Sequence, residues 1–164
     1  MINNNFHKFE LYNTLLLLSR NIFFYEKLKL KDSFETRIYL MFIHFSIILI
    51  IFKIKKTKFN QKSYDQLFDN IENNLREAGM GDVSVNKKMK DLNKILYDIL
   101  LKINSKNENE FNINKKLILK YFKELENVKS PIFQEFERYF IKFYEFCFEL
   151  PMDNMIREAI KFKY

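Results

Sequence analysis

The sequence contains very few of the residues that build tight turns, disulfide bonds and metal sites. It has two glycines, two prolines, one cysteine and no tryptophan among 164 residues. This scarcity of glycine and proline argues against a fold of many β-strands, which requires a tight turn after each strand. The single cysteine, Cys147, excludes an internal disulfide and any metal site built on several cysteines. We therefore expect neither a structural metal nor another cofactor.

A convincing catalytic pair is missing as well. No two carboxylates have a spacing that suggests general acid–base chemistry. Cys147 lies between Phe146 and Phe148, and burial in such surroundings raises the pKa of a thiol and makes it unreactive. The first residues lack the basic start and small-residue cleavage site of a secretory signal, and they are not an Arg-rich transit peptide. We expect a protein that is not an enzyme and that resides in the cytoplasm.

Positive charge and aromatic side chains are abundant. The net charge is +7, and 19 Phe with 9 Tyr account for the 17% aromatic content. Residues 131–164 carry six acidic and five basic side chains, so the basic excess belongs to residues 1–130. A basic surface favours RNA, the ribosome or an anionic membrane as a neighbour. Ordinary soluble proteins also carry such surfaces.

Apolar residues recur at helical spacing along nearly the whole chain. The first predicted helix ends at about Arg20. Further helices are predicted at residues 38–52, 64–78, 89–103, 115–128 and 132–150, and a short helix closes the chain. A polar loop is expected at residues 104–114, and no segment has the pattern of a convincing strand. The sequence thus predicts one all-α domain, residues 1–164, with about six to seven helices around a central apolar helix.

The central apolar run, residues 38–52, is too short for an ordinary membrane span. As a helix it would extend about 22 Å at ~1.5 Å per residue, whereas a bilayer core is about 30 Å thick. The lysine-rich "KIKKTK" that follows it would suit a membrane surface, but the length favours a buried core helix. His44 within the run is expected to be a core histidine bonded to a neighbour rather than a haem or metal ligand.

Both glycines lie in one short turn between two predicted helices. Gly79 is placed to be the left-handed residue that ends the first helix, and Gly81 relaxes the chain after it. The carboxylate of Asp82 is expected to accept backbone N–H bonds in the turn or to form an ion pair with Arg76. Ser84 is expected to cap a second helix that begins near Asn86. The spacing G-x-G-D after a helix does not match a nucleotide-binding fingerprint.

The segment "LREAGMGDVSVNKKMK", residues 75–90, resembles the signature of the ubiquinol–cytochrome c chaperone family, roughly L-R-E-x-G-x-G-D-x-x-V-x-K-x-x-K. The matching residues are Leu75, Arg76, Glu77, Gly79, Gly81, Asp82, Val85, Lys87 and Lys90. Upstream, Leu11, Tyr12, Arg20, Phe24 and Tyr25 are similar to the family's opening helix, and Arg37 with His44 fits an R-x6-H pattern. The resemblance covers about residues 9–100. Thr36 stands where the family usually has Gly, and Asn86 where Pro is common.

The resemblance implies a non-enzymatic chaperone that assists assembly of ubiquinol–cytochrome c reductase, the respiratory complex III. Its client would be newly made cytochrome b, bound before it acquires haem. The resemblance also implies a small partner subunit, the ribosome and the anionic inner membrane as neighbours, and no DNA. The protein would be peripheral to the inner membrane on its cytoplasmic face, or on the matrix side in a mitochondrion.

We expect the charged segment from Arg76 to Lys90 to form a rigid platform for the client or a partner. The candidate site and family-motif residues are Arg20, Tyr25, Arg37, His44, Arg76, Glu77, Gly79, Gly81, Asp82, Lys87, Lys88 and Lys90. Two other interpretations remain open, an RNA- or ribosome-binding module and a peripheral membrane adaptor. The Phe-rich helix over residues 132–150 is either part of the core or an exposed groove for an apolar client.

Overall fold

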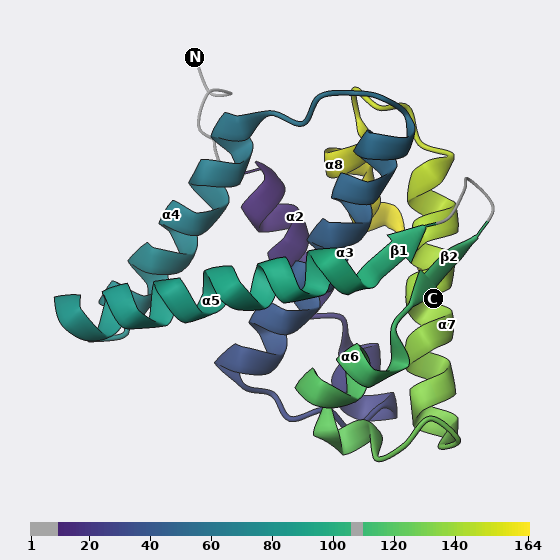
Figure 1. The fold of residues 1–164 in the computed structure, drawn as a ribbon, viewed down its shortest axis with the longest axis horizontal. Coiled ribbons are helices and arrows are strands. Elements are labelled where there is room, and N and C mark those ends of the chain that lie inside the picture. The colour runs from purple at the N-terminus through teal and green to yellow at the C-terminus, as the bar shows by residue number, and fades with distance from the viewer. Residues whose placement is uncertain (1–9, 106–109) are drawn as a thin grey trace.

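The computed structural model describes residues 10–105 and 110–164, which form one all-α domain (Figure 1). The described residues contain seven α-helices, as the sequence predicts. These helices are α2 (Glu10–Ser19), α3 (Phe34–Ile54), α4 (Gln61–Glu77), α5 (Asp82–Lys102), α6 (Lys115–Tyr121), α7 (Pro131–Phe148) and α8 (Met155–Glu158). Short helical turns are η1 (Phe23–Lys27), η2 (Lys123–Leu125) and η3 (Ala159–Lys161).

Helix α3 is the centre of the domain, and α2, α5 and α7 pack against it. It begins at Phe34, earlier than predicted, because Ser33 caps it by accepting a hydrogen bond from the Thr36 N–H at 3.2 Å. Thr36 is itself buried, and its hydroxyl lies 3.1 Å from that of Ser33. The departure from Gly at position 36 is thus accommodated within the helix cap.

Helix α3 is long and apolar enough to cross a membrane by length and composition alone. However, 67% of its most apolar 18-residue window is buried inside the domain. Its apolar side chains therefore already have protein neighbours, which supports the interpretation of α3 as a core helix.

The aromatic side chains of α7 pack into the core. Its six buried rings are Phe133, Phe136, Tyr139, Phe140, Phe143 and Tyr144, and Phe146 and Phe148 are half-buried. Rings from three other segments cover them: Phe24 of η1 stacks on Phe140, Phe111 stacks on Tyr144, and Phe162 contacts Phe143. The interpretation of this helix as an exposed apolar groove is therefore wrong, because segments distant in sequence cover its faces.

Two short strands, which the sequence did not predict, flank residues 106–109. Strand β1 (Ile103–Ser105) pairs antiparallel with β2 (Phe111–Ile113). The side chains of Ile103, Phe111 and Ile113 are buried while Asn112 is exposed. Three-residue strands are too short to show a clear alternation in the sequence. The helix expected at 115–128 is also shorter, since α6 ends at Tyr121 and η2 follows it.

We expect Phe140→Ala to destabilise the protein by about 3–5 kcal/mol, because it leaves a cavity where a fully buried ring contacted His44 and Phe136. The matched control is Leu17→Ala, at a side chain that is 56% exposed, and it should change stability by only about 0.5 kcal/mol. Urea unfolding of the three proteins measures both values. Equal effects of the two substitutions would contradict the position of α7 in the core.

Candidate functional site

The corner between α4 and α5, residues 78–82, is closed by backbone hydrogen bonds and projects at one edge of the domain (Figure 1). Gly79 has a φ of 91°, as predicted for a left-handed residue after a helix. Its N–H donates to the Arg76 carbonyl at 2.9 Å, and the Met80 N–H donates to the Leu75 carbonyl at 3.1 Å. This pair of bonds is the Schellman arrangement, which gives the exposed backbone at the end of α4 its partners.

Helix α5 begins at Asp82, so the predicted start near Asn86 and the predicted cap at Ser84 are wrong. Gly81 occupies the N-cap position with an extended backbone, and its carbonyl accepts from the Val85 N–H at 2.9 Å. A short corner therefore leads directly into the second helix. Asn86 lies one turn inside α5, so the absence of Pro there does not affect the helix start.

Arg76 joins the two sides of the corner. Its guanidinium donates to the Glu72 carboxylate at 3.0 Å and to the Asp82 carboxylate. The expected ion pair between Arg76 and Asp82 is therefore present, whereas no backbone N–H within the described residues donates to the Asp82 carboxylate. Arg76 and Asp82 hold the corner together, whereas the neighbouring Glu77 is exposed and forms no ion pair within the described residues.

One face of α5 presents an exposed row of side chains, of which the sequence interpretation identified only Lys87 and Lys90. Its members recur three or four residues apart, so they share one side of the helix. We call it the α5 stripe; it consists of Val83, Lys87, Lys90, Lys94, Tyr97 and Leu101. Val83 at one end is 86% exposed, and Tyr97 and Leu101 at the other end are 58% and 78% exposed. The three lysines between them are exposed as well. The spacing is visible in the sequence, although the prediction of this helix rests on the opposite, buried face.

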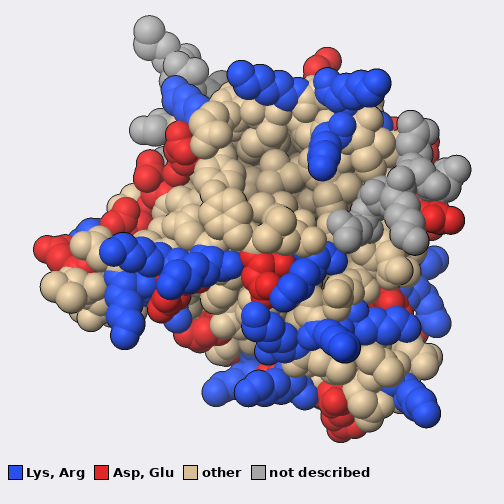
Figure 2. Space-filling model, in the orientation of Figure 1, with Lys and Arg blue, Asp and Glu red and all other residues tan. Residues whose placement is uncertain are grey.

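The lysines of the α5 stripe are free to contact a partner. Lys87, Lys90 and Lys94 form no ion pair with any residue that the structure describes. Figure 2 shows Lys and Arg side chains along α5, with an uncharged hollow between α5 and α4. The stripe extends about 27 Å at ~1.5 Å per residue. It combines a basic centre with apolar ends, a pattern that suits an acidic segment with apolar flanks.

A pocket of about 440 Å³ lies under the corner, between α2, the start of α3 and the end of α4. We call it the corner pocket. Its polar wall includes Arg20, Asp32, Glu35, Arg37, Asn74 and Lys88, and its apolar wall includes Leu16, Ile38, Met41, Leu75 and Met80. The structure thus brings Arg20, Arg37 and Lys88 together, although they are far apart in the sequence.

Two of the three cations in the corner pocket are neutralised by neighbouring acids. Arg37 bonds to the Asp32 carboxylate at 2.6 and 2.8 Å, and Lys88 bonds to that of Glu35 at 3.1 Å. The backbone at Glu35, and then Lys88, hold the pKa of this carboxyl below its usual value. Lys88 also lies 5.8 Å from the centre of the Phe34 ring. Lys88 therefore attaches α5 to α3 and, unlike Lys87, is not free.

Arg20 is the third cation, and it is exposed without an ion pair among the described residues. The positive charges of both Arg20 and Arg37 influence the hydroxyl of Tyr25. Burial and then the Asp32 carboxylate raise the pKa of Tyr25, while Arg37 and Arg20 oppose this rise. The Tyr25 hydroxyl donates to the Ser19 carbonyl at 2.6 Å. Both guanidinium groups, which line the corner pocket, therefore act on the same hydroxyl.

His44 lies apart from these residues, in the core as expected. Its Nδ1 is 2.6 Å from the Leu40 carbonyl oxygen, which only accepts, so Nδ1 carries the proton. Its Nε2 then accepts from the Tyr139 hydroxyl at 3.0 Å. Burial lowers the pKa of His44 to about 3, so the ring is neutral. With both nitrogens occupied by core groups, His44 is not placed to bind haem or a metal.

The single cysteine, Cys147, is buried in the core. Burial raises the pKa of the Cys147 thiol well above its usual value, which leaves it protonated and inert. Among the residues described, no three His, Cys, Asp or Glu side chains group closely enough to hold a metal ion. His7 lies outside the described residues.

Comparison with protein families gives a match over the middle of the chain. A family model described as ubiquinol-cytochrome C chaperone matches residues 26–127, which is more than half of the chain. No curated protein and no solved structure matches the chain. The matched residues include the corner, all of α5 and most of the corner pocket. They reach beyond residue 100, where the resemblance was expected to end, and they exclude residues 9–25.

We expect Gly79→Ala to lower stability by about 1–2 kcal/mol, because a φ of 91° strains any residue with a Cβ even where space is open. Gly79→Asn should lose less, since Asn tolerates this conformation. Gly81→Ser is the matched control, because its backbone is extended and its surroundings are open. It should leave stability unchanged or raise it by adding a cap. Thermal unfolding would contradict this explanation if both glycines proved equally sensitive.

The neutral state of His44 should make stability depend on pH. Below about pH 6.5 the unfolded chain binds a proton at this residue, while the folded protein does not until about pH 3. The stabilising contribution is therefore present above pH 6.5 and is lost as the pH falls. Compared with His44→Gln, the natural protein should lose about 1.4 kcal/mol more per pH unit between pH 6 and 4. The measurement is urea unfolding of both proteins across this pH range. If their free energies of unfolding changed in parallel with pH, folded His44 would bind the proton as the unfolded chain does.

Proposed function

Because the chain belongs to the ubiquinol–cytochrome c chaperone family, we propose that it binds newly made cytochrome b and assists assembly of ubiquinol–cytochrome c reductase. The family match carries this proposal, since it spans the corner and the whole of α5. The protein would act by binding alone, without chemistry on its client. In this role it would hold cytochrome b until haem and the other subunits are added.

The α5 stripe is the proposed contact surface. Exposed apolar side chains at Val83, Tyr97 and Leu101 offer area for an apolar client, and burying them would contribute favourable free energy on binding. The lysines between them would direct an acidic client segment into register. A surface on one helix is also rigid, because α5 packs along α3 and its start is held by the Arg76 ion pairs.

We place the protein at the cytoplasmic face of the inner membrane, or on the matrix side in a mitochondrion. The net charge of +7 supports a position beside anionic lipid or the ribosome. A small partner subunit could share the client, as the resemblance implies, and DNA is not an expected partner.

Binding to ribosomal RNA is the second candidate function. Three unpaired lysines in a row on α5 favour it, because such side chains bind phosphates and release counterions. The two functions differ in their response to salt. RNA binding would weaken steeply as salt rises, whereas a contact that also buries apolar side chains would weaken less.

Charge reversal on the α5 stripe tests the client contact. We expect Lys87→Glu/Lys90→Glu to reduce recovery of unassembled cytochrome b at least tenfold, with an unchanged Tm, because both lysines are free. The measurement is a mild-detergent pull-down of the tagged protein from its own cells, probed for cytochrome b lacking haem. Lys88→Glu should behave differently and lower stability by about 1 kcal/mol, because it places a carboxylate beside Glu35.

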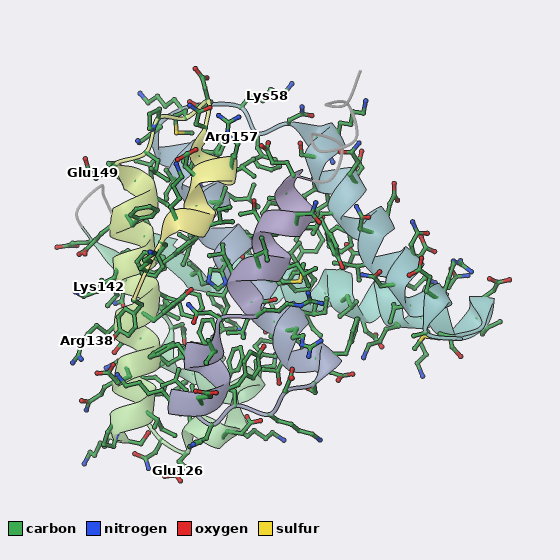
Figure 3. All side chains as sticks on the ribbon, turned by 180° about the vertical axis from the view of Figure 1, so that it is seen from behind. Lys58, Glu126, Arg138, Lys142, Glu149 and Arg157 are labelled. Carbon is green, nitrogen blue, oxygen red and sulfur yellow. The ribbon has the colours of Figure 1, made fainter. Side chains whose placement is uncertain are left out.

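Lys142→Glu is the matched control. Lys142 is exposed, forms no ion pair within the described residues, and extends from α7 at the edge opposite the corner (Figure 3). It should leave recovery of cytochrome b unchanged. If Lys142→Glu and the double variant lost the client equally, net charge and not the α5 stripe would govern binding. Recovery of ribosomes alone would favour the RNA function.

A further inference from the structure

The corner pocket contains one positive charge more than its own acids neutralise. Arg37 is paired with Asp32 and Lys88 with Glu35. Arg20 lines the same pocket, yet it has no acid among the described residues. The pocket therefore presents an uncompensated guanidinium to solvent, with a second guanidinium, that of Arg37, acting on the same Tyr25 hydroxyl.

The opposite wall of the corner pocket is apolar. Met41 and Ile38 of α3 lie there with Leu16 of α2, and Leu75 and Met80 contribute from the corner. Methionine side chains adapt to ligands of different shape. The volume of about 440 Å³ falls in the range of small-molecule sites. The pocket thus has the two parts that an amphiphile needs, a cationic wall and an apolar one.

The geometry points to the corner pocket as a binding site for a phosphate group attached to an apolar body, such as the head region of one anionic phospholipid. Arg20 would donate to the phosphate oxygens, with Arg37 beside it. The start of the acyl chain would lie against Leu16, Met41 and Met80. This site is separate from the α5 stripe and does not depend on the client.

Phosphate suits the pocket better than a carboxylate does. Asp32 and Glu35 already neutralise Arg37 and Lys88, so any incoming anion meets Arg20 as the uncompensated charge. A phosphate has more oxygens than a carboxylate, so it can accept two parallel N–H bonds from the planar guanidinium and still accept from a neighbouring donor. The apolar wall favours a lipid over free phosphate, because free phosphate would leave that wall uncovered.

The test measures binding of three probes to the purified full chain by calorimetry at low salt. The probes are dihexanoyl phosphatidylglycerol below its micelle concentration, dihexanoyl phosphatidylcholine and inorganic phosphate. We expect the anionic lipid to bind at least tenfold more tightly than the zwitterionic one. Arg20→Ala should weaken its binding at least tenfold, and Arg20→Lys should weaken it less. Because Arg20 is exposed and unpaired, neither substitution should change the Tm.

Two further variants locate the ligand. Ala78→Leu adds bulk where Ala78 lines the pocket, so it should weaken lipid binding and leave phosphate binding intact. Lys142→Ala, far from the pocket, should change neither. If phosphate binds as tightly as the lipid and Ala78→Leu has no effect, the phosphate chemistry holds and its source is soluble.

Three results would overturn the inference. The first is that no anionic probe binds, and the second is that Arg20→Ala binds the lipid as tightly as the natural protein does. The third is that Arg20→Ala no longer recovers cytochrome b in the pull-down but still binds the lipid normally. The last result would make Arg20 a contact for an acidic protein segment. Failure of the client proposal would look different, because Lys87→Glu/Lys90→Glu should retain lipid binding whether or not that proposal is correct.

Discussion

The burial of α3 is the constraint on which the rest of the structure depends. A 21-residue helix that is apolar on nearly all sides must be covered all round, and α2, α5 and α7 do this. Each fully buried large side chain contributes about 1.5–3 kcal/mol, most of which is offset by lost chain entropy. His44 is the largest of the buried polar residues on this helix, which also include Thr36 and Ser46. It is tolerated because the Leu40 carbonyl and the Tyr139 hydroxyl satisfy both ring nitrogens.

The same helix positions the two proposed binding surfaces. The start of α3 supplies Glu35, which holds Lys88, and Arg37, which holds Asp32. The Glu35–Lys88 bond connects the beginning of α5 to the start of α3, so the corner and the α5 stripe extend from a rigid support. The corner pocket lies where these segments meet. The α5 stripe can therefore present charge and apolar area without rearrangement, which lowers the entropy lost on binding a partner.

Local interactions explain which parts of the fold could be predicted from the sequence. The left-handed Gly79 and the cap at Ser33 both depend on residues within one turn, and Gly79 is found as expected. The start of α5 was misplaced because Ser84 is a stronger capping residue than Gly81 in general, yet the short corner places Gly81 there. The strands at Ile103 and Phe111 exist because their side chains pack into a core formed by distant helices, which no local pattern reveals.

The sequence by itself determined the helical class, the central apolar helix, the corner and the family signature, because these depend on spacing and on adjacent residues. The tertiary structure decided which charges are free. Lys87 and Lys88 are neighbours in the sequence, but only Lys88 meets Glu35, which lies 53 residues away. It also decided that the rings of α7 are covered and that Arg20 shares a pocket with Arg37. Ion pairing and burial depend on contacts between distant segments, and those contacts exist only once the helices have packed.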